Sequence, residues 1–361
     1  MKKYFIGALA VLAVFTACRR RAAAPRPTIP LVLAVSADTL GVGHIATRAG
    51  HIGAAGSVAI IGDPSDAISL AQYLRSSDSR DNIDGRYNRD SLPDFAGECF
   101  EVILDAYNEP YSHFVTEGPD AREHLDSLRE VAVRNALFAW DSTSVRTPAK
   151  ILVFTSPLQA EYGLFDVDTL QRLTGGRSLL LTSADAMLEE AYSRGSRHIL
   201  VWTGAKTRAS GAWQAVFARK GWEDATLSVL SPPDALDIRT ELRSLLRQYR
   251  SEGRKLDVIL LDTYQAQPSY LASELDIIRQ AGTEEDASFD RMLSRDFYFV
   301  EPRSALAKAV YDVLRSGNLF THRIARPLVR YYLTEESVQG GLVLEEADAS
   351  YVESAYVQDF R

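Results

Sequence analysis

Cysteine is scarce in this chain, and acidic residues outnumber basic ones. Only two cysteines, Cys18 and Cys99, occur among 361 residues, which excludes a disulfide framework and a cysteine-rich zinc site. Cys99 lies in an apolar run, and we expect a buried, inert thiol there. The 40 basic and 48 acidic residues leave a net charge of −8. Because an acidic surface repels phosphates, no nucleic-acid partner is expected.

The sequence motifs of common catalytic and cofactor sites are also missing. The chain has no Gly-x-Ser-x-Gly, His-Glu-x-x-His or Walker sequence. Residues 41–46 match a dinucleotide fingerprint only superficially, and a glycine-rich helix packed on the sheet is the preferred interpretation. Residues 80–91 lack the acidic first and last positions of a calcium loop, and no third ligand accompanies His44 and His51. We therefore predict no cofactor and no metal.

The amino terminus has the features of an export signal. Two lysines precede an apolar run from Tyr4 to Ala17, which is shorter than the roughly 20 residues that span a bilayer. The sequence Phe15-Thr16-Ala17-Cys18 then resembles the lipobox of bacterial lipoproteins. We predict a signal peptide over residues 1–17, a lipid such as palmitate on Cys18, and a tether over residues 18–29. An ordinary signal peptide with an incidental cysteine and an uncleaved anchor are the alternatives.

These features predict a protein of the cell envelope that is lipid-anchored to a membrane and faces the periplasm. In some bacteria an acidic stretch after this cysteine marks export to the cell surface, whereas here three arginines, Arg19–Arg21, follow it. We therefore prefer the periplasmic side, with the cell surface as the alternative location. The expected partners are the membrane, through the lipid anchor, and a membrane transporter or sensor.

Short apolar runs alternate with helical segments through the rest of the chain. Because the runs are continuous, they are typical of strands buried on both faces of a parallel sheet. The alternation predicts an α/β fold with two Rossmann-like lobes and parallel sheets. The expected strands are residues 31–36, 58–61, 100–105, 151–155, 178–181, 198–202, 226–230, 258–262 and 297–300, and the expected helices are 67–75, 121–140, 166–173, 184–193, 211–220, 238–251, 270–280 and 304–315.

Two of the expected strands share a short pattern. Residues 101–107 and 257–264 both read as a buried strand followed by Asp-x-Tyr, with Asp105 and Tyr107 in one and Asp262 and Tyr264 in the other. Ligands of open α/β sheets bind beyond the carboxyl ends of strands. An aspartate there accepts hydrogen bonds from hydroxyls and amines, and a tyrosine offers a ring for stacking. The pattern indicates two lobes with matching strand ends, with chance similarity as the alternative.

The centre of the chain resembles a known family. Residues 179–204 read as a strand, a helix closed by Gly195 and a strand ending in Thr-Gly, and Arg208 and a helix closed by Gly221 follow. This order resembles type I periplasmic binding proteins and the sugar-binding cores of lac-repressor-like regulators. The resemblance implies a first lobe over residues 30–184 and a second lobe over residues 185–361 with a C-terminal crossover segment. The chain departs from the family pattern at the polar stretch 76–94 and after residue 333.

The resemblance implies a membrane-anchored solute-binding protein that closes two lobes on a small polar ligand such as a sugar or nucleoside. Two alternatives remain: a periplasmic hydrolase or isomerase that uses strand-end carboxylates, such as the pair Asp105 and Asp262, and a scaffold lipoprotein with a vestigial cleft. Asp63 is also placed to cap a helix. The candidate ligand-binding residues lie at or just past expected strand ends: Asp38, Asp63, Asp105, Tyr107, Thr155, Arg208, Asp262 and Tyr264.

Overall fold

The computed structural model describes most of the chain after residue 25. The predicted signal peptide, Cys18 and most of the predicted tether lie outside the described residues, as do His51 and part of the calcium-like loop. Within the described part, every helix is too short or too polar to cross a membrane. The described residues are 26–48, 53–80, 85–118, 120–142, 146–233, 235, 237–250, 254–321, 323, 325–337 and 341–356.

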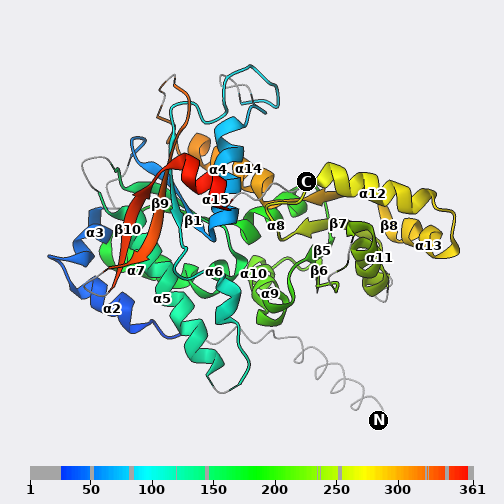
Figure 1. Ribbon diagram of the computed structural model, residues 1–361, viewed down its shortest axis with the longest axis horizontal. Helices are drawn as coiled ribbons and strands as arrows, with labels where there is room; N and C mark the ends of the chain where they lie inside the picture. Colours follow the sequence, from blue (N-terminus) through cyan, green and yellow to red (C-terminus); the bar gives the residue numbers. More distant parts are fainter. Residues whose placement is uncertain are drawn as a thin grey trace, which may run out of the picture.

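Two sheets organise the described chain and lie side by side along its longest axis (Figure 1). The first has six strands in the order β10-β9-β2-β1-β3-β4, and the second has four in the order β6-β5-β7-β8. All neighbours run parallel except β9 and β10. The predicted two-lobed α/β fold with parallel sheets is therefore confirmed. The strands are β1 Ser57–Gly62, β2 Cys99–Leu104, β3 Ala149–Phe154, β4 Leu179–Thr182, β5 His198–Trp202, β6 Thr226–Leu230, β7 Leu256–Leu261, β8 Leu293–Val300, β9 Leu328–Glu336 and β10 Leu342–Ala347.

Helices connect these strands and cover the faces of both sheets. They include two short helices, α6 and α9, that follow the carboxyl ends of β3 and β5. Their bounds are α2 Pro30–Ala37, α3 Val42–Arg48, α4 Pro64–Ser76, α5 Ala121–Trp140, α6 Pro157–Tyr162, α7 Leu164–Thr174, α8 Ser183–Ser193, α9 Ala205–Ser210, α10 Ala212–Lys220, α11 Ile238–Tyr249, α12 Pro268–Gln280, α13 Glu284–Met292, α14 Pro302–Ser316 and α15 Ala349–Tyr356, with a 3-10 turn at Tyr111–Phe114.

Strand β1 illustrates why helices cover both faces of the first sheet. Val58 and Ile60 belong to one apolar core with α4, α8 and α14, whereas Ala59 and Ile61 belong to another with α2, α5 and α7. All four side chains are fully buried. Alternate residues of a strand point to opposite faces, so both faces need an apolar cover. In Figure 1, α4, α14 and α15 lie on the upper side of this sheet and α2, α5 and α7 on the lower side.

The two lobes share one continuous core. The cluster that contains Val58 and Ile60 also contains Ile199 and Val258 of the second sheet, and α8 and α14 contribute to it from between the sheets. The opposite face of the second sheet has a core of its own with α11, α12 and α13. Hydrophobic burial therefore holds the two sheets together as well as stabilising each of them.

The chain returns to the first sheet after completing the second. Helix α14 packs against α4 and α8, and β9 then pairs with β2 from Cys99–Leu328 to Leu104–Leu333. Strand β10 forms the edge of the sheet by antiparallel pairing with β9. The sequence predicts the helix but neither strand, because β9 and β10 carry charged residues among their apolar ones.

The prediction of a strand over residues 31–36 is wrong. This run forms helix α2, in which Pro30 occupies the first turn and Val32 and Val35 are buried on one side. A short apolar run is compatible with a strand or a buried helix, and here the helix forms. Gly41 and Gly43 follow this helix. A side chain on Gly43 would collide with the carbonyl oxygens of Val35 and Asp38, so this close approach of the backbone requires a glycine.

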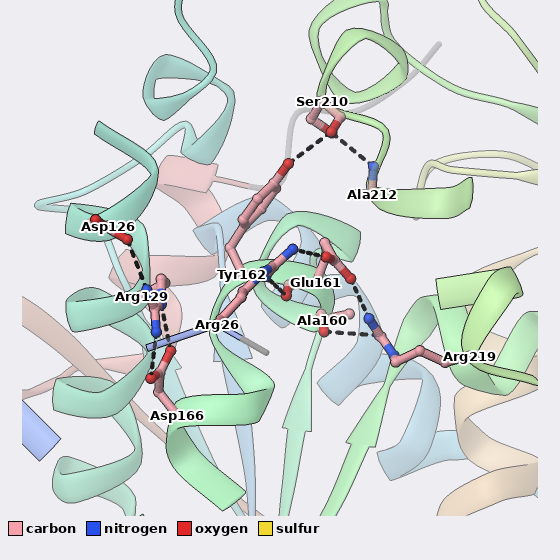
Figure 2. Close-up of polar contacts among 10 residues, drawn as sticks. All are labelled: Arg26, Asp126, Arg129, Ala160, Glu161, Tyr162, Asp166, Ser210, Ala212 and Arg219. Carbon is pink, nitrogen blue, oxygen red and sulfur yellow. Dashed lines mark hydrogen bonds and ion pairs between the residues drawn. The ribbon is translucent and has the colours of Figure 1, made fainter. Parts of the chain in front are cut away.

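A polar junction lies where α6 of the first lobe meets α9 and α10 (Figure 2). Glu161 on α6 is almost buried and accepts hydrogen bonds from both Arg26 and Arg219. The Tyr162 hydroxyl donates to the Ser210 carbonyl oxygen at 2.7 Å. The Glu161 carboxylate therefore joins the amino-terminal segment, the first lobe and helix α10.

Arg129 of α5 fixes the same amino-terminal segment. Its guanidinium donates to the Pro27 carbonyl oxygen at 2.7 Å and forms a bidentate pair with Asp166 at 2.7 and 2.9 Å. Ile29 is buried in the core beside it. The last residues of the predicted tether are therefore part of the folded lobe. Figure 2 shows Arg129 with Asp126 and Asp166.

Candidate functional site

Asp63 stands at the carboxyl end of β1, at the position that caps helix α4. Its side chain makes no capping hydrogen bond, although an aspartate there ordinarily accepts one from the helix backbone. Its Oδ1 atom is buried and has no hydrogen-bond partner among the described residues. Buried polar atoms without partners are rare in folded proteins, so the Asp63 carboxyl is a candidate for contact with a substrate or water.

The surroundings of Asp63 raise the pKa of its carboxyl to about 7. Burial is the main cause, because it penalises the charged form. A hydrogen bond from the Tyr111 backbone opposes this effect, whereas the negative charges of Glu109 and Asp105 add to it. At neutral pH this carboxyl is therefore divided between its protonated and ionised forms.

Asp66 lies three residues further on, in the first turn of α4. The pKa of its carboxyl is raised to about 8, chiefly by burial and also by the charges of Asp63 and Asp262, while hydrogen bonds with the Gln265 and Ser65 side chains oppose the rise. Residues three apart in a helix share a face. Asp63 and Asp66 therefore form a neighbouring pair of carboxyls that titrate near neutrality, with the second lobe's Asp262 close enough to act on Asp66.

Asp105, at the end of β2, is a fully buried and fully occupied carboxylate. It accepts hydrogen bonds from the Tyr111 hydroxyl at 2.8 Å and the Thr334 hydroxyl at 2.9 Å. The side-chain amides of Asn108 and Asn135 each donate to it at 2.7 Å. With four donors satisfied inside the protein, Asp105 holds the edge of the sheet together and has little capacity left for a ligand.

Further polar atoms without partners surround this edge. Thr155 Oγ1, Asn135 Oδ1 and both amide atoms of Gln159 are buried and have no hydrogen-bond partner among the described residues. Thr155 follows β3 and lies directly against Gly62, where any side chain would collide with its hydroxyl. Asn135 reaches the edge from α5 and Gln159 from α6. The carboxyl edge of the first sheet is therefore lined by hydrogen-bonding groups that the protein itself leaves unused.

The carboxyl edge of the second sheet carries a cavity of about 740 Å³. Asp262, which follows β7, lines it and accepts hydrogen bonds from the Thr203 hydroxyl and the Trp213 indole. Burial raises the pKa of the Asp262 carboxyl, and those two hydrogen bonds lower it. A volume of this size suits a small molecule.

Tyr264 closes the space between the two strand edges. It is 1% exposed, and its hydroxyl donates to the Thr155 carbonyl oxygen at 2.9 Å. The Ser69 hydroxyl of α4 in turn donates to the Tyr264 carbonyl oxygen at 3.2 Å. Burial raises the pKa of the Tyr264 phenol well above its ordinary value. Tyr264 therefore connects the lobes and is not free to stack on a ligand.

The predicted site residues separate into two groups. Asp63, Asp105 and Thr155 meet at the first edge, with Asp262 and Tyr264 beside them on the second lobe. The other three lie elsewhere. Asp38 is exposed and accepts hydrogen bonds from the backbone of residues 40–42 at the start of α3. Tyr107 is 52% exposed and lines a separate cavity of about 310 Å³, and Arg208 is exposed on α9.

Sequence reasoning missed the partners of Asp63. The Asp-Pro-Ser-Asp run after β1 is a helix-start signal, and the spacing of its two aspartates places both on the first turn. That spacing was the available signal for Asp66. No sequence pattern points to Glu109, Asn135 or Gln159, because the tertiary fold brings them to the edge.

Neither thiol nor metal chemistry is supported at this edge by the described residues. Cys99 lies at the opposite, amino end of β2, and burial raises the pKa of its thiol to about 11. No group of three or more metal-binding side chains occurs in the described part of the chain. The chemistry available there is that of carboxyl, hydroxyl and amide groups.

The comparisons with known proteins identify similar structures only. No protein-family model and no curated protein sequence matches the chain. Glutamate racemase from Francisella tularensis, solved with D-glutamate, is 14% identical with a TM-score of 0.49, covering 85% of this chain and 96% of its own. Glutamate racemase from Aquifex pyrophilus is 14% identical with a TM-score of 0.48, over 78% and 90%. An arylmalonate decarboxylase is 13% identical with a TM-score of 0.33, over 73% and 93%.

The predicted membership of the type I periplasmic binding proteins is wrong, and so is the solute-binding function that it implied. The solved structures that the chain is similar to are racemases and decarboxylases with two α/β lobes.

Proposed function

We propose that this protein is an isomerase that moves protons with the carboxyls of Asp63 and Asp66. One observation carries the proposal: Asp63 occupies a helix-capping position without capping, and its buried Oδ1 has no partner beside a second carboxyl. A helix whose N-cap carboxylate forms no capping hydrogen bond is less stable than one whose carboxylate does. Such local exceptions are expected where a side chain serves function.

The two carboxyls are matched for proton transfer in both directions. General acid–base catalysis is most efficient when the pKa of the catalytic group lies near the working pH. Asp63 and Asp66, with pKa values of about 7 and about 8, meet that condition. An isomerisation uses such a pair with one carboxyl ionised to take a proton and the other protonated to return one.

The charges at the site favour a neutral or positively charged substrate. None of the groups that shift the pKa of Asp63 or Asp262 is an arginine or lysine, and Glu109 and Asp105 add negative charge. An anionic substrate would be repelled by this row of carboxylates. D-Glutamate, present in one similar solved structure, is therefore a poor candidate for this chain. Hydroxyl- or amine-bearing molecules suit the unpaired acceptors Thr155 Oγ1 and Gln159 Oε1.

The place of the reaction follows from the predicted lipid on Cys18. With that anchor, the enzyme would work at a membrane of the cell envelope. Arg26 and Pro27 are held on the folded lobe, so the tether available to lift the site from the membrane ends at about that point.

Exchange of carbon-bound hydrogen in heavy water tests the proposal. The full-length protein in nonionic detergent is incubated in D₂O with aldoses, ketoses, amino sugars, amino alcohols and glutamate, and deuterium uptake is followed by mass spectrometry. We expect uptake in a neutral or cationic class, with Asp63→Asn and Asp66→Asn each slower by about 10²-fold or more. Asp38→Asn, which changes a distant helix cap, is the matched control and keeps the wild-type rate.

Two results would overturn the proposal: no exchange in any of these classes, or exchange at the wild-type rate by Asp63→Asn. The pH profile adds a second criterion. If one carboxyl must be protonated and the other ionised, the rate is highest between the two pKa values of about 7 and about 8 and falls on either side. A rate that is flat from pH 5 to about 9 contradicts the assignment of this pair.

A further inference from the structure

The cavity at the carboxyl edge of the second sheet has a chemistry that differs from that of the first edge. It has a volume of about 740 Å³, is open to solvent on one side, and is bounded by the ends of β5, β6 and β7 and the starts of α11 and α12. The walls are mostly apolar and include Trp202, Leu261 and Leu271, with two prolines, Pro232 and Pro233, on the β6 side. An apolar pocket with few polar groups is the usual form of a small-molecule site.

The polar groups in this cavity carry one sign of charge. Asp262 and Glu241 are its acidic lining residues, and no arginine or lysine lines it among the described residues. Thr203 and Thr263 add hydroxyls. A ligand that brings a cation or a hydrogen-bond donor would complement these carboxylates.

Each carboxylate retains capacity for a ligand. Both described donors to Asp262, from Thr203 and Trp213, reach its Oδ2 atom, and no described residue donates to Oδ1. Among the described residues, the Ala235 backbone alone donates to the Glu241 side chain, at 3.2 Å to Oε1. A carboxylate has room for about four hydrogen bonds. By comparison, Asp105 on the first sheet has all four in place.

We propose that this cavity binds the apolar part of an amine, with the ammonium group at Asp262 and an aromatic or branched aliphatic body against Trp202 and Leu271. The inference goes beyond the proposed function, because it assigns a ligand class to a cavity whose lining residues all belong to the second lobe. An ammonium pairs with the Asp262 carboxylate and also interacts favourably with the indole face. The apolar body gains from burial in proportion to its area.

Three small aromatic probes of matched shape test the inference: benzylamine, benzyl alcohol and benzoate. Binding to the full-length protein in nonionic detergent is measured by calorimetry and by the fluorescence of Trp202, with a Trp202→Phe variant to identify that signal. We expect benzylamine to bind more tightly than benzyl alcohol and benzoate not to bind. Asp262→Asn should weaken benzylamine about 10-fold, the loss of one charge-assisted hydrogen bond, and leave benzyl alcohol within about 2-fold.

A cavity-filling variant separates the pocket from the detergent and from misfolding. Ala266→Phe places a ring in the cavity without removing a packed side chain, so it should abolish binding of benzylamine while the melting temperature is retained. Binding that survives Ala266→Phe places the probe elsewhere and overturns the inference. Equal affinity for benzoate, or no effect of Asp262→Asn, overturns it as well.

The outcome is distinguishable from failure of the proposed function. Benzylamine binding does not require proton transfer, so it should be unchanged in Asp63→Asn. If benzylamine binds as expected but no compound of any tested class exchanges hydrogen in D₂O, the pocket stands and the isomerase is wrong. If exchange occurs only in sugars and benzylamine does not bind, the isomerase stands and the amine pocket is wrong.

Discussion

Asp105 and Asp262 occupy equivalent places in two similar sequences, yet their surroundings differ. Each follows a buried parallel strand and begins an Asp-x-Tyr run. Asp105 is 0% exposed and accepts four hydrogen bonds, whereas Asp262 lines a cavity and accepts two. The two tyrosines are reversed: Tyr107 is 52% exposed and Tyr264 is 1% exposed.

The difference lies in what each strand end meets. Asp105 is covered by α5, β9 and the 3-10 turn, which supply Asn135, Thr334 and Tyr111. Among the described residues, only the Thr203 hydroxyl and the Trp213 indole donate to the Asp262 side chain, which lines the cavity. The same short motif is therefore structural in one lobe and available for function in the other. Four substitutions or pairs of substitutions test this comparison.

The largest expected effect comes from removing the two aspartates in turn. Asp105→Ala leaves two buried donors, the Tyr111 hydroxyl and the Asn135 amide, without their acceptor, and should cost about 4 kcal/mol of the free energy of unfolding. Asp262→Ala removes two bonds beside an open cavity and should cost about 1–2 kcal/mol. Denaturant unfolding at pH 7 measures both. Equal losses would break the contrast between a structural and an available strand end.

The next effect is the pH dependence of stability that the Asp63–Asp66 pair confers. The folded pKa values of Asp63 and Asp66, about 7 and about 8, lie above the ordinary value of about 3.9. The folded state therefore holds protons that the unfolded state releases. Stability from this source is complete below about pH 4 and is lost as the pH rises to about 8, by at most about 1.4 kcal/mol per pH unit for each carboxyl.

Replacing both carboxyls by amides checks that sign. The double variant Asp63→Asn, Asp66→Asn should lose this decline and be more stable than the wild type at pH 9, as measured by thermal melting across pH. A double variant that is less stable than the wild type at pH 9 would show that the carboxylates are stabilising, contrary to the account.

A smaller effect distinguishes the two tyrosines. Tyr264→Phe removes a buried hydroxyl that donates to the Thr155 carbonyl oxygen across the lobes, and should cost about 1 kcal/mol. Tyr107→Phe removes an exposed hydroxyl and should be neutral within about 0.5 kcal/mol. Unfolding in urea compares them. If the two variants are equally stable, Tyr264 does not join the lobes.

The smallest effect concerns two aspartates at helix starts. Asp38 caps the backbone of residues 40–42, and these hydrogen bonds lower the pKa of its carboxyl, so Asp38→Ala should destabilise slightly. Asp63 caps nothing, so Asp63→Asn should not destabilise at neutral pH. Thermal melting of the two variants, side by side, shows whether only Asp38 behaves as a cap. A comparable loss in Asp63→Asn would remove the main argument for its functional role.

Much of the fold was predictable because its strands and helices are strongly patterned. The bounds of β5, β6 and α5 match their expected residues, since each is a continuous apolar or regularly spaced run between clear turn residues. The run 31–36 and strands β9 and β10 were not predicted correctly. Their local sequences are ambiguous, and pairing with β2 or packing on the sheet decides their structure.

The site was less predictable than the fold. Strand ends could be located, which brought Asp63, Asp105, Thr155 and Asp262 into consideration. Whether a strand-end carboxylate is occupied depends on residues far away in sequence, such as Thr334 at Asp105. Burial, which sets the pKa of Asp63 and Asp66, is likewise a property of the assembled lobes.

The central claim is that Asp63 and Asp66 exchange protons near neutral pH, and carboxyl titration by NMR tests it most directly. The full-length protein is labelled with ¹³C at aspartate side-chain carboxyls, and Asp63→Asn and Asp66→Asn variants assign the two signals. The account predicts that these signals titrate with pKa values of about 7 and about 8. Titration of both near the ordinary aspartate value of about 3.9 would contradict it.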